Sequence, residues 1–131
     1  AMGLCVLPYM NKILANRHQA VALYTEMLGN QKQLYIITPD DDVAHNAAYF
    51  PVVFSSEKVL LHVMQALKNQ QIFPRRYFYP TLNTLPYVTK QHMPIAEDIS
   101  VRILCLPLSS EISETEVAKI CEVVRNALST I

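Results

Sequence analysis

The chain has only two glycines, Gly3 and Gly29, in 131 residues. Because a phosphate-cradling loop needs closely spaced glycines, such a loop cannot be built from this sequence. The cysteines are also few: Cys5, Cys105 and Cys121 are odd in number, lie in apolar stretches and lack the spacing of a metal site. They predict reduced thiols in a cytoplasmic protein.

An excess of one charge is absent as well, because 11 acidic and 11 basic residues give a formal net charge of zero. The chain therefore has no electrostatic footprint for nucleic acid or for an anionic membrane surface. It also lacks an apolar run of the about 20 residues that span a bilayer, and the pattern of a signal peptide. With 51% hydrophobic residues, the chain can bury one core and forms one domain or part of one.

Apolar residues at helical spacing predict two long helices, over residues 10–28 and from Ser55-Ser56 to about Lys68. Gly29 is expected to end the first of them. A third long helix should begin at the capping box formed by Ser113 and Glu116. Pro94 suits the first position of a shorter helix that carries acidic residues in its first turn.

Short apolar stretches predict strands at Leu34–Thr38, Ala47–Phe54 and Arg102–Pro107. Pro51 lies inside the second stretch, which favours an edge strand or a bulge there. The fold class is therefore α/β, a sandwich in which a short, mostly antiparallel sheet is covered by helices. The whole of residues 1–131 is expected to form one domain.

Three adjacent aspartates, Asp40, Asp41 and Asp42, follow the first predicted strand. One short run does not supply the six or more oxygen ligands that Ca²⁺ takes, so a solvated loop is favoured over a metal site. No metal-ligating residue is predicted.

The most unusual stretch is residues 72–87, which combines prolines, aromatic residues and an arginine pair. Its centre predicts an extended segment, with Arg76 and Phe78 on one side and Tyr77 and Tyr79 on the other. Such a segment could hold a ligand between phenol hydroxyls and apolar packing. The alternative is that the tyrosines cover a core and the arginines are solvated.

Four motifs occur in register along the chain: Asn46-Ala-Ala-Tyr-Phe-Pro51, Arg75-Arg-Tyr-Phe-Tyr-Pro80 with Leu82-Asn83, Pro94-Ile-Ala-Glu-Asp98 and Leu104-Cys-Leu-Pro-Leu108. Together they resemble the C-terminal part of the DegT-type sugar-nucleotide aminotransferases. The resemblance covers nearly all 131 residues and implies the small domain of a fold-type I aminotransferase.

The resemblance implies an activity that depends on pyridoxal phosphate and transfers an amino group from glutamate to a nucleotide-linked keto-deoxysugar. In this family the cofactor lysine and the phosphate-binding loop belong to a large N-terminal domain, so neither is expected in this chain. Its six lysines lie on polar helix faces or in loops, where a depressed-pKa amine is not expected. We therefore assign no catalytic residue, and expect neither a cofactor nor amino transfer in the 131-residue chain alone.

The resemblance places Arg76, Tyr77, Tyr79 and Asn83 near the nucleotide sugar or the cofactor entrance of the intact enzyme. Many relatives have histidine at the position of Asn83. Asparagine donates and accepts hydrogen bonds but does not titrate near neutral pH, so the expected role of Asn83 is a sugar-hydroxyl contact.

The expected partners are the chain's own large domain, a second subunit and the nucleotide-sugar substrate. Without its partner domain, the chain should expose an apolar patch along its first helix, with Leu4, Leu7, Ile13 and Leu14, and should form a homodimer or larger species.

Two other interpretations remain. A free-standing ligand-binding or assembly module would use the aromatic segment without catalysis. Binding of single-stranded nucleic acid through Arg75, Arg76 and the aromatic residues is disfavoured by the neutral charge.

Overall fold

The computed structural model describes residues 2–39 and 43–131 of the chain. Its elements, in order, are α1 (Met2–Val6), η1 (Leu7–Tyr9), α2 (Met10–Leu28), β1 (Leu34–Ile36), β2 (Phe50–Phe54), α3 (Glu57–Asn69), η2 (Leu82–Thr84), α4 (Pro94–Arg102), β3 (Ile103–Leu106) and α5 (Glu114–Ser129).

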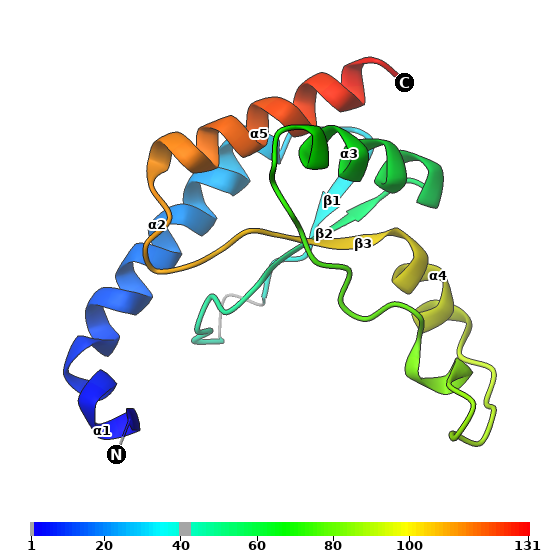
Figure 1. Cartoon of the computed structure of the whole chain (residues 1–131), viewed down its shortest axis with the longest axis horizontal. Helices are drawn as coiled ribbons and strands as arrows, with labels where there is room; N and C mark the ends of the chain where they lie inside the picture. Colours follow the sequence, from blue (N-terminus) through cyan, green and yellow to red (C-terminus); the bar gives the residue numbers. More distant parts are fainter. Residues whose placement is uncertain (1, 40–42) are drawn as a thin grey trace.

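The described strands form a three-stranded sheet in the order β1-β2-β3, and both pairs are antiparallel. Helix α5 packs beside both α2 and α3, and these three helices cover one face of the sheet (Figure 1). The predicted α/β sandwich with a short antiparallel sheet is confirmed.

Helix starts agree with the sequence patterns. The hydroxyl of Ser56 accepts a hydrogen bond from the Val59 N–H at the start of α3. Ser113 and Glu116 form the predicted capping box of α5, with reciprocal side-chain to backbone hydrogen bonds. Each cap satisfies backbone donors that the first helical turn leaves unpaired.

The core lies between the sheet and the three helices. It gathers the predicted apolar faces of α3 and α5 with alternate residues of the strands: Phe50, Val52, Phe54, Leu104 and Leu106. The ring of Tyr24, fully buried on α2, stacks on Phe50 with 4.7 Å between ring centroids. Its hydroxyl donates a hydrogen bond of 2.8 Å to the Pro107 carbonyl. Burial without an anion-stabilising partner raises the pKa of the Tyr24 hydroxyl.

The prediction that Pro51 marks an edge strand or a bulge is wrong, because β2 is the central strand. Cys105, the partner of Pro51 on β3, makes its backbone hydrogen bonds to Arg75, away from β2. On the other side, β1 ends at Ile36, one residue before the position that faces Pro51. Ile37 at that position donates a 3.4 Å backbone hydrogen bond to the Pro51 carbonyl, so the missing N–H of Pro51 removes only the return bond where the pairing of β1 with β2 ends.

Residue 102 is the second difference, because the stretch predicted as a strand from Arg102 begins with the last residue of α4. The Arg102 guanidinium pairs with Asp98 one turn earlier and also donates to the Phe54 carbonyl at the end of β2. These partners hold Arg102 in the helix, and β3 starts at Ile103.

Two extensions lead away from the core (Figure 1). One is α1 with the start of α2, where Leu4 and Leu7 are 77% and 65% exposed, as predicted. Ile13 and Leu14, predicted in the same patch, are half-buried. The other extension contains η2 and α4 and exposes Phe78, Leu82, Tyr87 and Ile95, which the sequence did not indicate.

No helix in residues 2–39 and 43–131 combines the length and hydropathy required to cross a membrane.

Candidate functional site

The aromatic segment does not form the predicted extended strand. Arg75 makes a single bridge to Cys105 through two backbone hydrogen bonds of 3.1 and 2.8 Å, and the chain then turns at residues 77–80. The predicted alternation of side chains is therefore wrong beyond Tyr77. Arg76 and Tyr79, expected on opposite sides, lie against each other, with the guanidinium carbon 3.7 Å from the ring centroid.

The side chain of Arg76 is directed into the protein and is only 15% exposed. It forms an ion pair of 3.1 Å with Glu57 at the start of α3 and donates a 2.9 Å hydrogen bond to the Val101 carbonyl of α4. With Tyr79 on its face, Arg76 connects the aromatic segment to two helices. It lines neither of the cavities described below.

Asn83 is also held by the protein. Its side-chain amide donates two hydrogen bonds of 2.7 Å, to the Gln91 carbonyl and to the Glu97 carboxylate. Glu97 in addition accepts from the Met93 N–H at the start of α4. These two donors hold the pKa of the Glu97 carboxyl below its usual value. Asn83 therefore joins η2, the loop before α4 and α4 itself.

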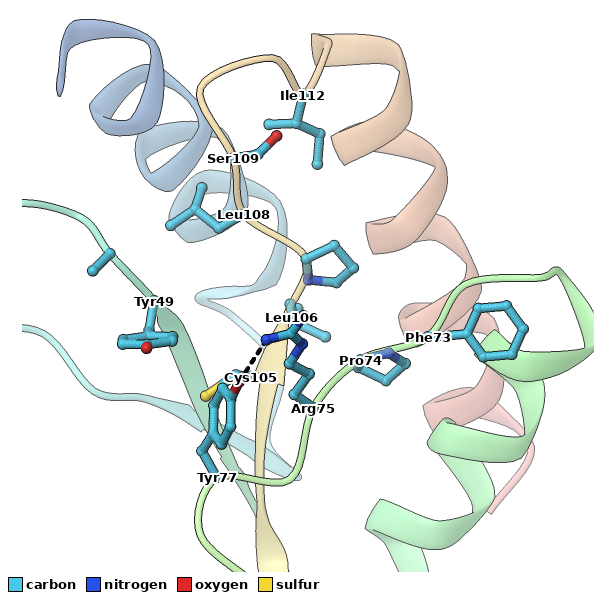
Figure 2. Close-up of a pocket in the computed structure, with 12 residues that line it drawn as sticks. Tyr49, Phe73, Pro74, Arg75, Tyr77, Cys105, Leu106, Leu108, Ser109 and Ile112 are labelled. Atoms are coloured by element: carbon cyan, nitrogen blue, oxygen red, sulfur yellow. Dashed lines mark hydrogen bonds between the residues drawn. The ribbon is translucent and has the colours of Figure 1, made fainter. Parts of the chain in front are cut away.

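Tyr77 is the predicted site residue that borders two cavities. It lines an open cavity of about 420 Å³ between β3 and residues 73–77, and its hydroxyl accepts a hydrogen bond from Arg75 (Figure 2). The Tyr49 ring meets the Tyr77 ring edge to face, with 5.5 Å between centroids. Tyr77 also borders a second cavity of about 410 Å³.

The first cavity, which we call the Arg75 cavity, combines one cation with aromatic and apolar walls. Figure 2 shows the Arg75 side chain beside Tyr77, with Leu106, Leu108 and Ile112 along β3 and the segment after it. Its other lining residues are Ala48, Tyr49, Phe73, Pro74, Cys105, Pro107 and Ser109. The hydrogen bond to Tyr77 raises the pKa of the Arg75 guanidinium, so this side chain remains a cation.

The second cavity is an apolar groove between η2 and α4. Its lining residues are Tyr77, Phe78, Thr81, Leu82, Asn83, Met93, Ala96, Ile99, Ser100 and Ile103. The predicted site residues are thus divided: Tyr77 borders both cavities, Asn83 borders this groove, and Arg76 and Tyr79 line neither.

Arg75 and Tyr49 were not predicted as site residues. A signal for Arg75 was present, because residues i and i+2 of an extended segment share a side, which pairs Arg75 with Tyr77. For Tyr49 the sequence had no such signal, because its contact with Tyr77 joins segments 28 residues apart in the chain.

The cysteines are free thiols, as predicted. Burial raises the pKa of Cys105 above its usual value and that of Cys121 to about 11, so both are neutral near pH 7. Among the described residues no three His, Cys, Asp or Glu side chains cluster as a metal site would require. Asp40, Asp41 and Asp42, predicted as a solvated loop, lie outside the described residues.

Comparison with known proteins gives one consistent family. The sequence model of the DegT/DnrJ/EryC1/StrS aminotransferase family matches residues 1–125. A dTDP-4-amino-4,6-dideoxy-D-glucose transaminase from Shigella dysenteriae is 31% identical over an alignment 131 positions long, which covers 95% of this chain and 36% of that protein. A transaminase of the same name from Escherichia coli is 26% identical over an alignment 128 positions long, which covers 92% of this chain and 34% of that protein.

The fold is shared with solved structures. The crystal structure of the aminotransferase TlmJ from Streptoalloteichus hindustanus superposes with a TM-score of 0.90 at 20% identity, over 98% of this chain and 35% of that one. This chain therefore spans about a third of the length of the proteins that it resembles.

Proposed function

The chain belongs to the DegT/DnrJ/EryC1/StrS aminotransferase family, and we propose that it serves as the C-terminal small domain of an enzyme that aminates a nucleotide-linked keto-deoxysugar with glutamate as amino donor. The observation that carries this proposal is the similarity along 95% of the chain to a transaminase named for a dTDP-linked amino sugar.

Pyridoxal phosphate is the cofactor of this family and supplies an electron sink for amino transfer when bound. The residues of this chain do not fit its covalent attachment, because all six lysines are exposed and none lines the Arg75 cavity or the apolar groove. A lysine that reacts as a neutral amine is normally desolvated or placed beside another cation. We therefore assign no catalytic residue here and propose that the cofactor is held by the rest of the intact enzyme.

The described residues would act on binding and orientation. The phenol group of Tyr77 lines the Arg75 cavity. The nearby Tyr79 is 48% exposed. Arg76 and Asn83 hold this segment through Glu57 and Glu97, so their part in recognition is to fix its position. This division assigns ligand contact to Tyr77 and support to Arg76 and Asn83.

A chimaera tests the proposal. Residues 1–131 replace the matching segment of the Shigella dysenteriae transaminase, and amino transfer is assayed with that enzyme's own substrates. Restored activity would support the proposal, and a folded chimaera that binds the cofactor without transferring amino groups would contradict it. The 131-residue chain alone should show no amino transfer, since its lysines are exposed to water.

A binding or assembly module is the second candidate, and the chain's own closed core together with its exposed apolar extensions favours it. The intact mass of the protein in its host separates the two functions. A mass near 14.9 kDa without a pyridoxal chromophore indicates the module, whereas the mass of a whole aminotransferase with the chromophore indicates the enzyme. For the enzyme we propose a cytoplasmic location and a homodimer.

A further inference from the structure

We propose that Arg75 and Tyr77 form an oxyanion-binding pair in the Arg75 cavity, which takes a phosphate or a carboxylate group of a ligand. The inference deepens the proposed function and rests on it for the choice of ligands. Its starting point is the different environment of the two neighbouring arginines.

The position of Arg75 is fixed by the sheet while its head group stays available. Its backbone N–H and carbonyl both bond to Cys105, with distances of 3.1 and 2.8 Å. The side chain is exposed, and its one hydrogen bond among the described residues goes to the Tyr77 hydroxyl. A guanidinium has five N–H donors in a planar fork, so an edge remains for an oxyanion.

Tyr77 supplies a second donor at the same place. Its hydroxyl oxygen accepts from Arg75, which leaves the hydroxyl hydrogen to donate to a ligand. The Tyr49 ring packs edge to face against the Tyr77 ring and so supports its position in the cavity wall. Two donors, one of them charged, therefore meet at one point of the cavity.

The surroundings favour an anion. Within residues 2–39 and 43–131, the lining of the Arg75 cavity contains no aspartate or glutamate and Arg75 makes no ion pair. Burial raises the pKa of the Cys105 thiol and keeps it neutral, so this thiol adds no negative charge to the cavity. The apolar side chains of Leu106 and Leu108 line the same cavity and offer no side-chain group that would compete for an anion.

Arg76 cannot take this role, because its head group is held by the protein and its Nε, which has no partner among the described residues, is buried. It pairs with Glu57, donates to the Val101 carbonyl and stacks on Tyr79. An external anion would have to displace Glu57 from a side chain that is 15% exposed. The geometry thus selects Arg75, which the sequence motif alone does not distinguish from its neighbour.

The test is to titrate the 131-residue protein separately with dTDP, inorganic phosphate and glutamate. Calorimetry and the NMR signals of the arginine side chains measure the binding. We expect saturable binding that shifts the Arg75 signal and weakens with added salt. Arg75→Gln should weaken binding about tenfold or more and Tyr77→Phe about threefold, as expected for loss of charged and neutral hydrogen bonds. Arg125→Gln, which removes an exposed arginine of α5 far along the chain, should bind as the parent does.

The ligands separate the two sources of the anion. Tighter binding of dTDP than of glutamate assigns the pair to a phosphate of the nucleotide, and the reverse order assigns it to the carboxylate of the amino donor. Absence of binding, or equal affinity of the parent and Arg75→Gln, would overturn the inference, provided that circular dichroism shows both proteins folded. Because this readout needs no amino transfer, an inactive chimaera together with intact anion binding would reject only the proposed function.

Discussion

Arg75 and Arg76 share a chemistry and differ in what surrounds them. The head group of Arg76 has three partners supplied by three separate parts of the chain, Glu57, Val101 and Tyr79. The head group of Arg75 meets only Tyr77 within the described residues and borders a cavity. At the scale of a residue, exposure and partners therefore decide which arginine supports the fold and which is available to a ligand.

Replacement of Arg76 should destabilise the protein. Arg76→Gln removes the charged hydrogen bonds to Glu57 and Val101 and should lower the free energy of unfolding by about 2 kcal/mol. Arg75→Gln is the matched control and should change it by less than about 0.5 kcal/mol, as is usual for an exposed side chain. Urea denaturation followed by circular dichroism measures both, and equal losses would contradict the assignment.

Asn83 should control the titration of Glu97. Its amide donates to the Glu97 carboxylate, so Asn83→Asp removes a donor and adds a like charge, and the pKa of Glu97 should rise. Because the folded protein lowers this pKa, the stabilising contribution of Glu97 is present above the usual glutamate value and is lost as the pH falls through the lowered value. In the variant this loss should begin at higher pH.

The measurement is an NMR titration of the glutamate carboxyl carbons. Glu116, whose pKa is lowered by the separate contact with Ser113, serves as an internal control and should titrate unchanged. A Glu97 titration that does not move in Asn83→Asp would show that the amide is not its partner in solution.

At the scale of an element, the long helices depend on caps that the local sequence provides. The Ser113 hydroxyl accepts from the Glu116 N–H, and the Glu116 carboxylate accepts from the Ser113 N–H. Helix α5 carries six buried residues and packs on both α2 and α3. Its start therefore matters for the whole core.

Loss of the α5 cap should be measurable. Ser113→Ala removes one half of the capping box and should lower the free energy of unfolding by about 1 kcal/mol. Ser55→Ala is the matched control, because the Ser55 side chain makes no hydrogen bond within the described residues, and its effect should be close to zero. Thermal and urea unfolding of the two variants compare them, and equal stability would count against a contribution from the cap.

At the scale of the whole molecule, the two extensions place apolar side chains in water. Met2, Leu4 and Leu7 are exposed on the α1 side, and Phe78 and Ile95 on the α4 side. Contiguous exposed apolar surface marks a contact with another protein surface. In the proposed enzyme these extensions would meet the large domain or a second subunit.

Self-association of the chain should depend on the α1 extension. The double variant Leu4→Glu with Leu7→Glu should shift the protein toward the monomer in sedimentation velocity, because two charges replace exposed apolar side chains. Leu61→Glu, at a 44% exposed position of α3, is the control and should sediment as the parent does. A parent protein that is monomeric at every concentration would reject the predicted homo-oligomer.

The local features of this fold followed from the sequence by itself. Some features depend only on residues close together in the chain, so residue spacing predicts them. They are the limits of α2, the buried faces of α3 and α5, the capping box and the first position of α4. The motif of residues 75–80 likewise drew attention to Tyr77, which does border both cavities.

Only the tertiary structure decided the features that join distant segments. Pro51 is tolerated in the central strand because it stands where the pairing with β1 ends and because its β3 partner Cys105 bonds to Arg75, which the sequence around Pro51 cannot report. Arg76 points inward because Glu57 lies 19 residues earlier, and Asn83 is occupied because Glu97 lies 14 residues later. The ends of such contacts are brought together by packing, so periodicity cannot reveal which of two adjacent arginines faces the cavity.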